Sequence, residues 1–122
     1  MDIVGPINSG EVLSCLDSAS NADSGSRISG TVVAVYVKPN ISCLSSPTVT
    51  IATKSEPIIT ILAEAGFEEA DWRFPVTPVH LHTTGAAIAN VYSNGVPIHD
   101  YVNVAISDAN YGDDVDVYLL VE

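Results

Sequence analysis

Basic residues are scarce in this chain, which has four Lys and Arg against 15 Asp and Glu and a formal net charge of −11. Nucleic acids and anionic membranes are bound by clustered basic side chains that displace counterions. The four here, Arg27, Lys38, Lys54 and Arg73, are scattered along the sequence. The composition therefore predicts no direct binding of nucleic acid and no attraction to an anionic membrane.

The total content of charged residues is also low. Charged residues make up 16% of the chain, against about 25% in an average globular domain. The surface must then be completed by Ser, Thr, Asn and Gly, which is typical of β-rich structural proteins and of oligomers with large interfaces. No stretch approaches the roughly 18 apolar residues of a membrane helix.

The N-terminus and the cysteines indicate the compartment. The first ten residues, MDIVGPINSG, have an acid at position 2 and a Gly-Pro pair, which is not the pattern of a signal peptide. We therefore expect a protein made in the cytosol. Cys15 and Cys43 are then expected to be free thiols, partly buried, with a disulfide between them as the alternative.

The chain contains many short segments with the composition of β-strands. With 122 residues, 47% of them hydrophobic, it is long enough for one domain with a substantial core. Alternating or β-branched segments occur at 11–16, 27–38, 48–53, 58–62, 72–82, 87–92, 101–106 and 115–121. Turn compositions separate them at 20–26, 93–97 and 109–114, and a single helical turn is conceivable at 62–65. This spacing predicts an all-β fold: one antiparallel β-sandwich, jelly-roll-like, of about eight strands over residues 11–122, preceded by a flexible arm over 1–10.

The segment DWRFPVTPVHLH, residues 71–82, contains two histidines two positions apart. His80 and His82 would point to the same side of a strand, but a zinc site needs three or four converging ligands. Pro75 and Pro78 indicate an edge strand or a bulge. We expect the histidines to face solvent or a neighbouring subunit, where their charging near pH 6 to 7 would make contacts sensitive to pH. No metal site and no cofactor are predicted.

Catalytic motifs are not recognisable. The acidic segment SDANYGDDVD, residues 107–116, has Gly112 before its acids and no Glu at the calcium-loop distance, so it predicts an acidic hairpin turn rather than an EF-hand. Neither cysteine lies in a nucleophile motif, and no glycine pattern suited to phosphate is present. We therefore predict no catalytic residues and no enzymatic activity.

The aromatic residues leave an alternative open. Trp72, Phe74, Tyr92, Tyr101 and Tyr118 occupy or adjoin predicted strands, where aromatic side chains usually fill a core or a subunit interface. A sugar-binding surface would use the same residue types. A carbohydrate-binding β-sandwich module is therefore an alternative to a structural role.

The order of the short motifs carries a resemblance. ISGTVVAVYV, PTVTIAT, PIITIL, DWRFPVTPVH, TTGAAI, VPIHDYVNVAIS and VDVYLLVE follow one another over residues 28–122. This order resembles small virion proteins of tailed bacteriophages that coat the capsid as cement or decoration proteins. The resemblance implies a non-enzymatic protein of the virion, on the capsid exterior, that binds and stabilises the shell of the major capsid protein. It also implies a homo-oligomer, a trimer or a dimer. A phage tail or head-fibre component has a similar composition and is a second alternative.

Two segments are expected to make the contacts with the capsid or with other subunits. The N-terminal arm is one, because extended arms can add a strand to a neighbour's sheet. The segment 71–82 is the other. The residues expected in these contacts are Ile3, Val4, Pro6, Ile7, Trp72, Phe74, His80 and His82.

Overall fold

The computed structural model describes residues 2–13, 19–40, 47–67, 69–80, 87–109 and 112–122. Within these ranges every regular element is a strand, so none of the described residues lies in a helix that could cross a membrane. The strands are β1 (Asp2–Asn8), β2 (Ser20–Asp23), β3 (Ile28–Asn40), β4 (Thr48–Thr53), β5 (Thr60–Glu64), β6 (Asp71–Arg73), β7 (Val76–His80), β8 (Ala87–Asn94), β9 (Val96–Asp100), β10 (Val102–Ser107) and β11 (Asp114–Val121).

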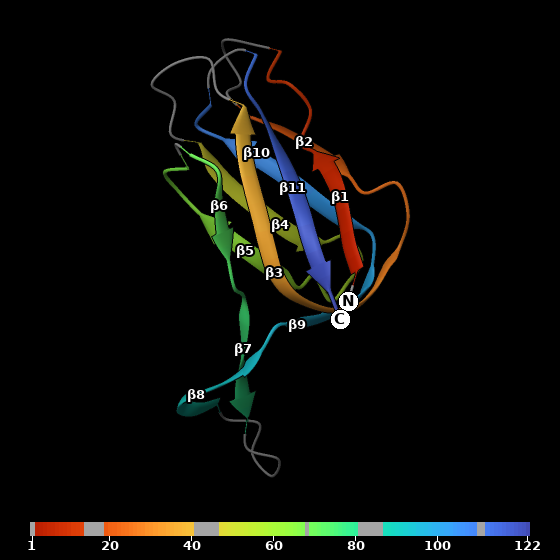
Figure 1. Ribbon diagram of the computed structural model, residues 1–122, viewed down its shortest axis with the longest axis vertical. Helices are drawn as coiled ribbons and strands as arrows, with labels where there is room; N and C mark the ends of the chain where they lie inside the picture. Colours follow the sequence, from red (N-terminus) through yellow and green to blue (C-terminus); the bar gives the residue numbers. More distant parts are fainter. Residues whose placement is uncertain (1, 14–18, 41–46, 68, 81–86, 110–111) are drawn as a thin grey trace.

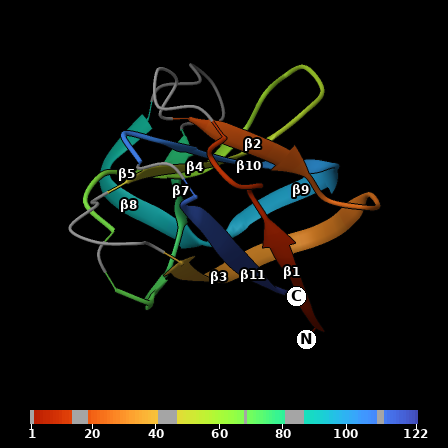
Figure 2. The same cartoon turned by 90° about the horizontal axis from the view of Figure 1, so that it is seen from above.

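Two antiparallel sheets form the body of the protein. The first has the order β1-β11-β3-β6, with β9 also paired to β3, and the second has the order β2-β10-β4-β5. Figure 2 shows the two layers, with β2, β10 and β4 on one side and β3, β11 and β1 on the other. The predicted all-β sandwich is confirmed, whereas these sheet orders do not establish a jelly roll.

The core lies between the two sheets and follows the two-residue period of the strands. In β4, β10 and β11 every second residue is buried, and the intervening residues are partly exposed. Branched aliphatic side chains suit this position because they pack well on a pleated surface. The largest fully buried side chains are Ile51, Ile106, Leu119, Val12, Val32, Val35, Val37, Val49, Val102, Val104, Val115 and Val117.

The 13-residue strand β3 supports two different neighbours along one edge. Its residues 28–32 pair with β9, its residues 35–37 pair with β6, and β11 pairs along its other edge. The chain between β6 and β9 leaves the sheet as a separate two-stranded ribbon formed by β7 and β8. Figure 1 shows this ribbon extending beyond the sandwich.

The first differences from the sequence prediction concern strands at positions predicted as a loop or a turn. Residues 20–26, predicted as a loop, contain β2, whose Asn21 and Asp23 accept hydrogen bonds from the amide of Asn103 on β10. Residues 93–97, predicted as a turn, contain the end of β8 and the start of β9. Cross-strand hydrogen bonds stabilise β2 without the hydrophobic alternation that marks a strand in the sequence, whereas β9 buries Val96 and Ile98 in the core.

Three other predicted elements also differ from the structure. The expected strand 72–82 is divided into β6 and β7 by Phe74 and Pro75. The possible helical turn at 62–65 lies largely in β5. Of the predicted strand 11–16, residues 11–13 are not in a strand and the others lie outside the described residues.

Residues 2–8 form β1 instead of the loose arm expected over residues 1–10. β1 pairs with β11 from Asp2↔Val121 to Asn8↔Asp116, with a register shift between Val4 and Ile7. Ile7 is buried and Val4 packs against the core. The segment is therefore an edge strand of the first sheet, because its apolar residues contribute to the same core as β11.

Candidate interaction surfaces

The ribbon of β7 and β8, together with Phe74 just before β7, exposes large apolar side chains. Phe74 is 71% exposed, Val76 48% and Tyr92 58%. Val76 pairs with Asn94, two positions from Tyr92, so the side chains of Val76 and Tyr92 lie on the same face of the ribbon. We call Phe74, Val76 and Tyr92 the ribbon surface.

This surface lies in a part of the chain without fixed charge. Residues 74–99 contain no Asp, Glu, Lys or Arg, although the whole chain carries a net charge of −11. All 15 acidic residues therefore lie outside this segment. The ribbon is thus a projection without fixed charge from a strongly acidic protein.

At the base of the ribbon, hydrogen bonds join its two chain segments to each other. The Gly95 amide donates to the Pro75 carbonyl at 2.9 Å, and the Thr77 hydroxyl donates to the Gly95 carbonyl at 2.8 Å. A hollow of about 480 Å³ lies at this junction, lined by Val33, Ala34, Phe74, Pro75, Val76, Asn94, Leu120 and Glu122. The ribbon surface therefore begins at the edge of the first sheet and continues outward.

Three aromatic side chains form a row across the outer face of the first sheet. Trp72 on β6 pairs with Tyr36 on β3, and Tyr36 pairs with Tyr118 on β11. The ring centroids of Trp72 and Tyr36 lie 5.0 Å apart and those of Tyr36 and Tyr118 lie 6.1 Å apart, with successive planes inclined by 45° and 47°. We call these residues the aromatic row. With Ile3 and Lys38 they line a shallow hollow of about 440 Å³.

A group of polar side chains lies beside the aromatic row on the same face. Asp116, two residues before Tyr118, pairs with Asn8 on β1 and with Lys38 on β3. The Asn8 amide donates to Asp116 at 2.8 Å and to Asp114 at 3.0 Å. The Asn40 amide donates to the other oxygen of Asp116 at 3.1 Å. The aromatic row is therefore bordered by an ordered set of carboxylates and amides.

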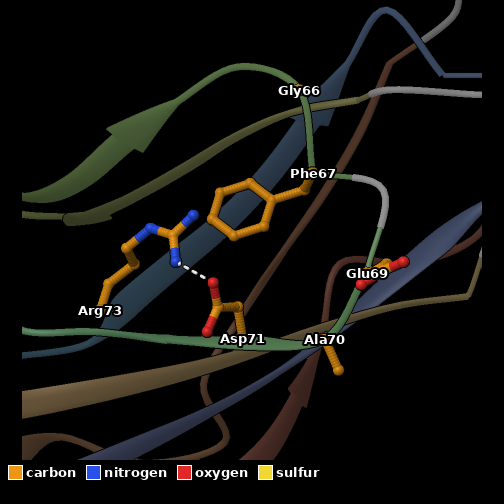
Figure 3. Close-up of a pocket in the computed structure, with 6 residues that line it drawn as sticks. All are labelled: Gly66, Phe67, Glu69, Ala70, Asp71 and Arg73. Atoms are coloured by element: carbon orange, nitrogen blue, oxygen red, sulfur yellow. Dashed lines mark hydrogen bonds and ion pairs between the residues drawn. The ribbon is translucent and has the colours of Figure 1, made fainter.

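A third hollow, of about 400 Å³, surrounds Arg73 and is lined by Gly66, Phe67, Glu69, Ala70, Asp71 and Arg73. Figure 3 shows the Arg73 guanidinium beside the Phe67 ring, with one nitrogen facing Asp71. The guanidinium carbon lies 4.9 Å from the Phe67 centroid, and Arg73 donates to Glu64 and Asp71. The Arg73 hydrogen bond lowers the pKa of Asp71, and Glu64 raises that of Arg73. These charges are already paired, so the cluster is a structural link.

The buried carboxylate of Asp100 likewise already has hydrogen-bond partners within the protein. It accepts the Ser55 amide at 2.6 Å and the Tyr101 amide at 2.7 Å. The Ser55 hydrogen bond lowers the pKa of Asp100 below its usual range, so this group is an anion that fixes the loop after β4. Among the described residues, no three His, Cys, Asp or Glu side chains converge as a metal site would require.

The structure distributes the predicted contact residues over different places. Trp72 and Ile3 line the hollow of the aromatic row, and Phe74 belongs to the ribbon surface. Ile7 is buried, so its side chain is not available for the contact predicted for it, and Val4 is partly buried against the core. Pro6 is exposed in the bulged part of β1.

Only part of the histidine and cysteine predictions falls on residues that the structure describes. His80 ends β7, paired with Ala87, while His82, Cys15 and Cys43 lie outside the described residues. Tyr36 and Val76 were missed as surface residues. Tyr36 stands in the largely apolar run VVAVYV, yet the strand places it on the outer face. The tyrosine itself, the only polar side chain in that run, was the signal.

No protein-family model matches the chain, and comparison with curated proteins and with solved structures found no match either.

Proposed function

We propose that this protein is a non-enzymatic structural protein of a virion, a cement or decoration protein that binds the outer surface of the major capsid shell and stabilises it. The observation that carries the proposal is the ribbon. It projects from the sandwich, exposes Phe74, Val76 and Tyr92, and lies in 26 residues, 74–99, that contain no Asp, Glu, Lys or Arg. The order of the sequence motifs supports the same function.

The ribbon has the properties of the centre of a protein–protein interface. Such centres are depleted in charged residues and enriched in aromatic ones, because burying an ion without a partner is costly. Burying each large side chain of the ribbon surface would contribute about 1.5–3 kcal/mol. The ribbon can therefore be covered by a partner without the removal of water from any fixed charge.

The charge distribution also favours a contact through the ribbon over one through the sandwich. A body with a net charge of −11 repels an acidic partner surface at short range, and this repulsion is weakest where no fixed charge is present. In the proposed homo-oligomer, a dimer or a trimer, the ribbons would therefore be left free to contact the shell. Several ribbons in one oligomer would bind a repetitive shell more strongly than a single ribbon.

The test is co-sedimentation with expanded shells of the major capsid protein encoded beside this chain. We expect saturable binding at a fixed copy ratio, and a loss of binding when Phe74 and Tyr92 are both replaced by Ser. The matched control is Ile58→Ser, because Ile58 is also an exposed apolar residue, 60% accessible, but precedes β5 on the other sheet. Sedimentation velocity of the same proteins measures the oligomer.

The outcomes separate the proposal from its alternatives. Equal binding by the double variant and the control would show that the ribbon is not the contact. A folded wild-type protein that does not bind shells would contradict the cement function and favour a tail or head-fibre component. The carbohydrate-binding alternative is favoured by one specific observation, the aromatic row. It predicts saccharide binding at that row, which is tested separately below.

A further inference from the structure

We propose that the aromatic row binds a neutral saccharide chain, laid across β6, β3 and β11. This site is separate from the ribbon and does not depend on the proposed virion function. Its elements are the rings of Trp72, Tyr36 and Tyr118, and the polar side chains beside them.

The rings form a prearranged surface. All three stand on strands paired in one sheet, and they face one another in exact cross-strand register, Trp72↔Tyr36↔Tyr118. Neighbouring rings contact one another at 5.0 and 6.1 Å between centroids, which limits their rotation. A ligand would bind without first ordering these side chains, and that lowers the entropic cost of association.

Saccharide rings suit this arrangement for an electrostatic reason. The face of an aromatic ring is negative, and the C–H groups on one side of a sugar ring are weakly positive. Successive planes in the row are inclined by 45° and 47°, so the surface turns from strand to strand. It fits consecutive sugar units of a twisted chain better than one flat ring system.

The border of the row supplies partners for hydroxyl groups. Asp116 and Asp114 accept hydrogen bonds, and Lys38 donates them, on the same face as Tyr118 and Tyr36. Asn8 and Asn40 hold the two carboxylates in place. An aromatic surface with carboxylates and amides at its edge matches a ligand that has both C–H faces and hydroxyls.

The same border argues against a protein partner at this place. A protein interface would bury Asp116 and Lys38 beside the rings, and each ion would lose water unless a charge met it. The ribbon, by contrast, has no fixed charge to bury. The two surfaces therefore differ in the chemistry that each can accept.

The charge of the border also selects among saccharides. Two carboxylates and a net charge of −11 would repel uronates, sulfated chains and nucleic acids. Neutral hexose, pentose or N-acetylhexosamine chains are not repelled. We therefore expect the site to distinguish neutral chains from anionic ones of equal length.

Trp72 provides a direct measurement, because it is the single tryptophan of the chain and is 44% exposed. A sugar ring stacked on its indole would shift its emission to shorter wavelength. The experiment titrates the full-length protein with cellohexaose, xylohexaose, mannohexaose, laminarihexaose and chitohexaose, with hexamers of mannuronate as the anionic probe. We expect a saturable shift with at least one neutral hexamer and none with the anionic hexamer.

Variants locate the binding. Tyr118→Ala keeps the Trp72 reporter and removes one ring of the row, and we expect binding about tenfold weaker. Phe74→Ala removes an equally large exposed ring two residues from Trp72 but outside the row, and should leave the titration unchanged. Calorimetry on Trp72→Phe checks the result without the reporter, and thermal unfolding shows that each variant is folded.

Several outcomes would overturn the inference. These are no shift with any neutral hexamer, an equal shift with the anionic hexamer, or unchanged affinity in a folded Tyr118→Ala protein. Shell binding by the same samples is recorded separately. Failure of the saccharide site leaves shell binding intact, and failure of the virion function leaves the saccharide titration intact.

Discussion

Arg73 on β6 and Glu64 on β5 are joined across the sandwich by two hydrogen bonds, from Nε to Oε2 at 2.6 Å and from Nη2 to Oε1 at 3.1 Å. β6 belongs to the first sheet and β5 to the second. The pair therefore closes one open side of the sandwich, and Phe67 under the guanidinium completes the link.

Replacing Glu64 by Gln should lower the thermal unfolding midpoint by about 2–4 °C. The loss is small because both side chains are partly exposed, 31% and 39%, and water screens such pairs. Thermal unfolding in low salt and in 1 M NaCl measures the effect. The difference between wild type and variant should shrink in high salt, and a difference that does not depend on salt would argue against an ionic contribution.

Gly95→Ala should destabilise the protein more than Gly66→Ala. Both glycines have φ of +81°, but a Cβ at Gly95 would lie 2.6 Å from Thr31 Cγ2 and 2.8 Å from the Val32 carbonyl, whereas at Gly66 nothing lies within 4 Å. Each variant carries the cost of a left-handed alanine, about 1–2 kcal/mol. Gly95→Ala adds overpacking of roughly 1–3 kcal/mol. Urea unfolding of both proteins measures the difference, and equal midpoints would contradict the close packing of the ribbon base on β3.

The stabilising effect of Asp100 should depend on pH. Its folded pKa lies below the usual value because the Ser55 and Tyr101 amides donate to it. A lowered folded pKa means that the stabilisation is complete above the ordinary carboxyl pKa, about 3.9, and is lost as the pH falls through the folded value. Wild type should therefore exceed Asp100→Asn in stability at pH 7, and the two should converge below about pH 4. Chemical denaturation at pH 7, 5, 4 and 3 tests this, and a constant difference would refute it.

Ile51→Ala should lower the free energy of unfolding by about 2–5 kcal/mol, because it leaves a cavity between the sheets. Ile51 is fully buried on β4. Ile3→Ala is the matched control, since Ile3 is 70% exposed on β1 and should change the stability by no more than about 0.5 kcal/mol. Equilibrium unfolding in urea compares the two. A large loss of stability in Ile3→Ala, with none in Ile51→Ala, would contradict the position of the core between the two sheets.

The strands with strong alternation could be predicted from the sequence. Residues 48–53 coincide with β4, residues 101–106 differ from β10 by one residue at each end, and residues 115–121 differ from β11 by one residue at the start. Each has aliphatic residues at every second position, and this pattern records which side of the strand is buried. The same pattern identified the sandwich core.

Other features depend on partners that are distant in the sequence. β2 has no hydrophobic pattern and exists because β10 pairs with it. The sequence of β1 predicts a loose arm, because its hydrogen-bonding partner β11 lies more than 100 residues later in the chain. The aromatic row escaped prediction for the same reason, since only the register of three strands aligns Trp72, Tyr36 and Tyr118. The ribbon's lack of charge was visible in the sequence, but its projection was not.

The pairing of β1 with β11 sets the response of the domain to mechanical load. Asp2 lies opposite Val121, so both ends of the chain leave from the same end of one strand pair (Figure 1). Tension between these ends would open the β1–β11 ladder one pair at a time, like a zipper. Tension on the ribbon would instead pass into β6 and β9, which are held by two separate stretches of β3. The protein should therefore yield easily when pulled by its ends and resist when pulled by its ribbon.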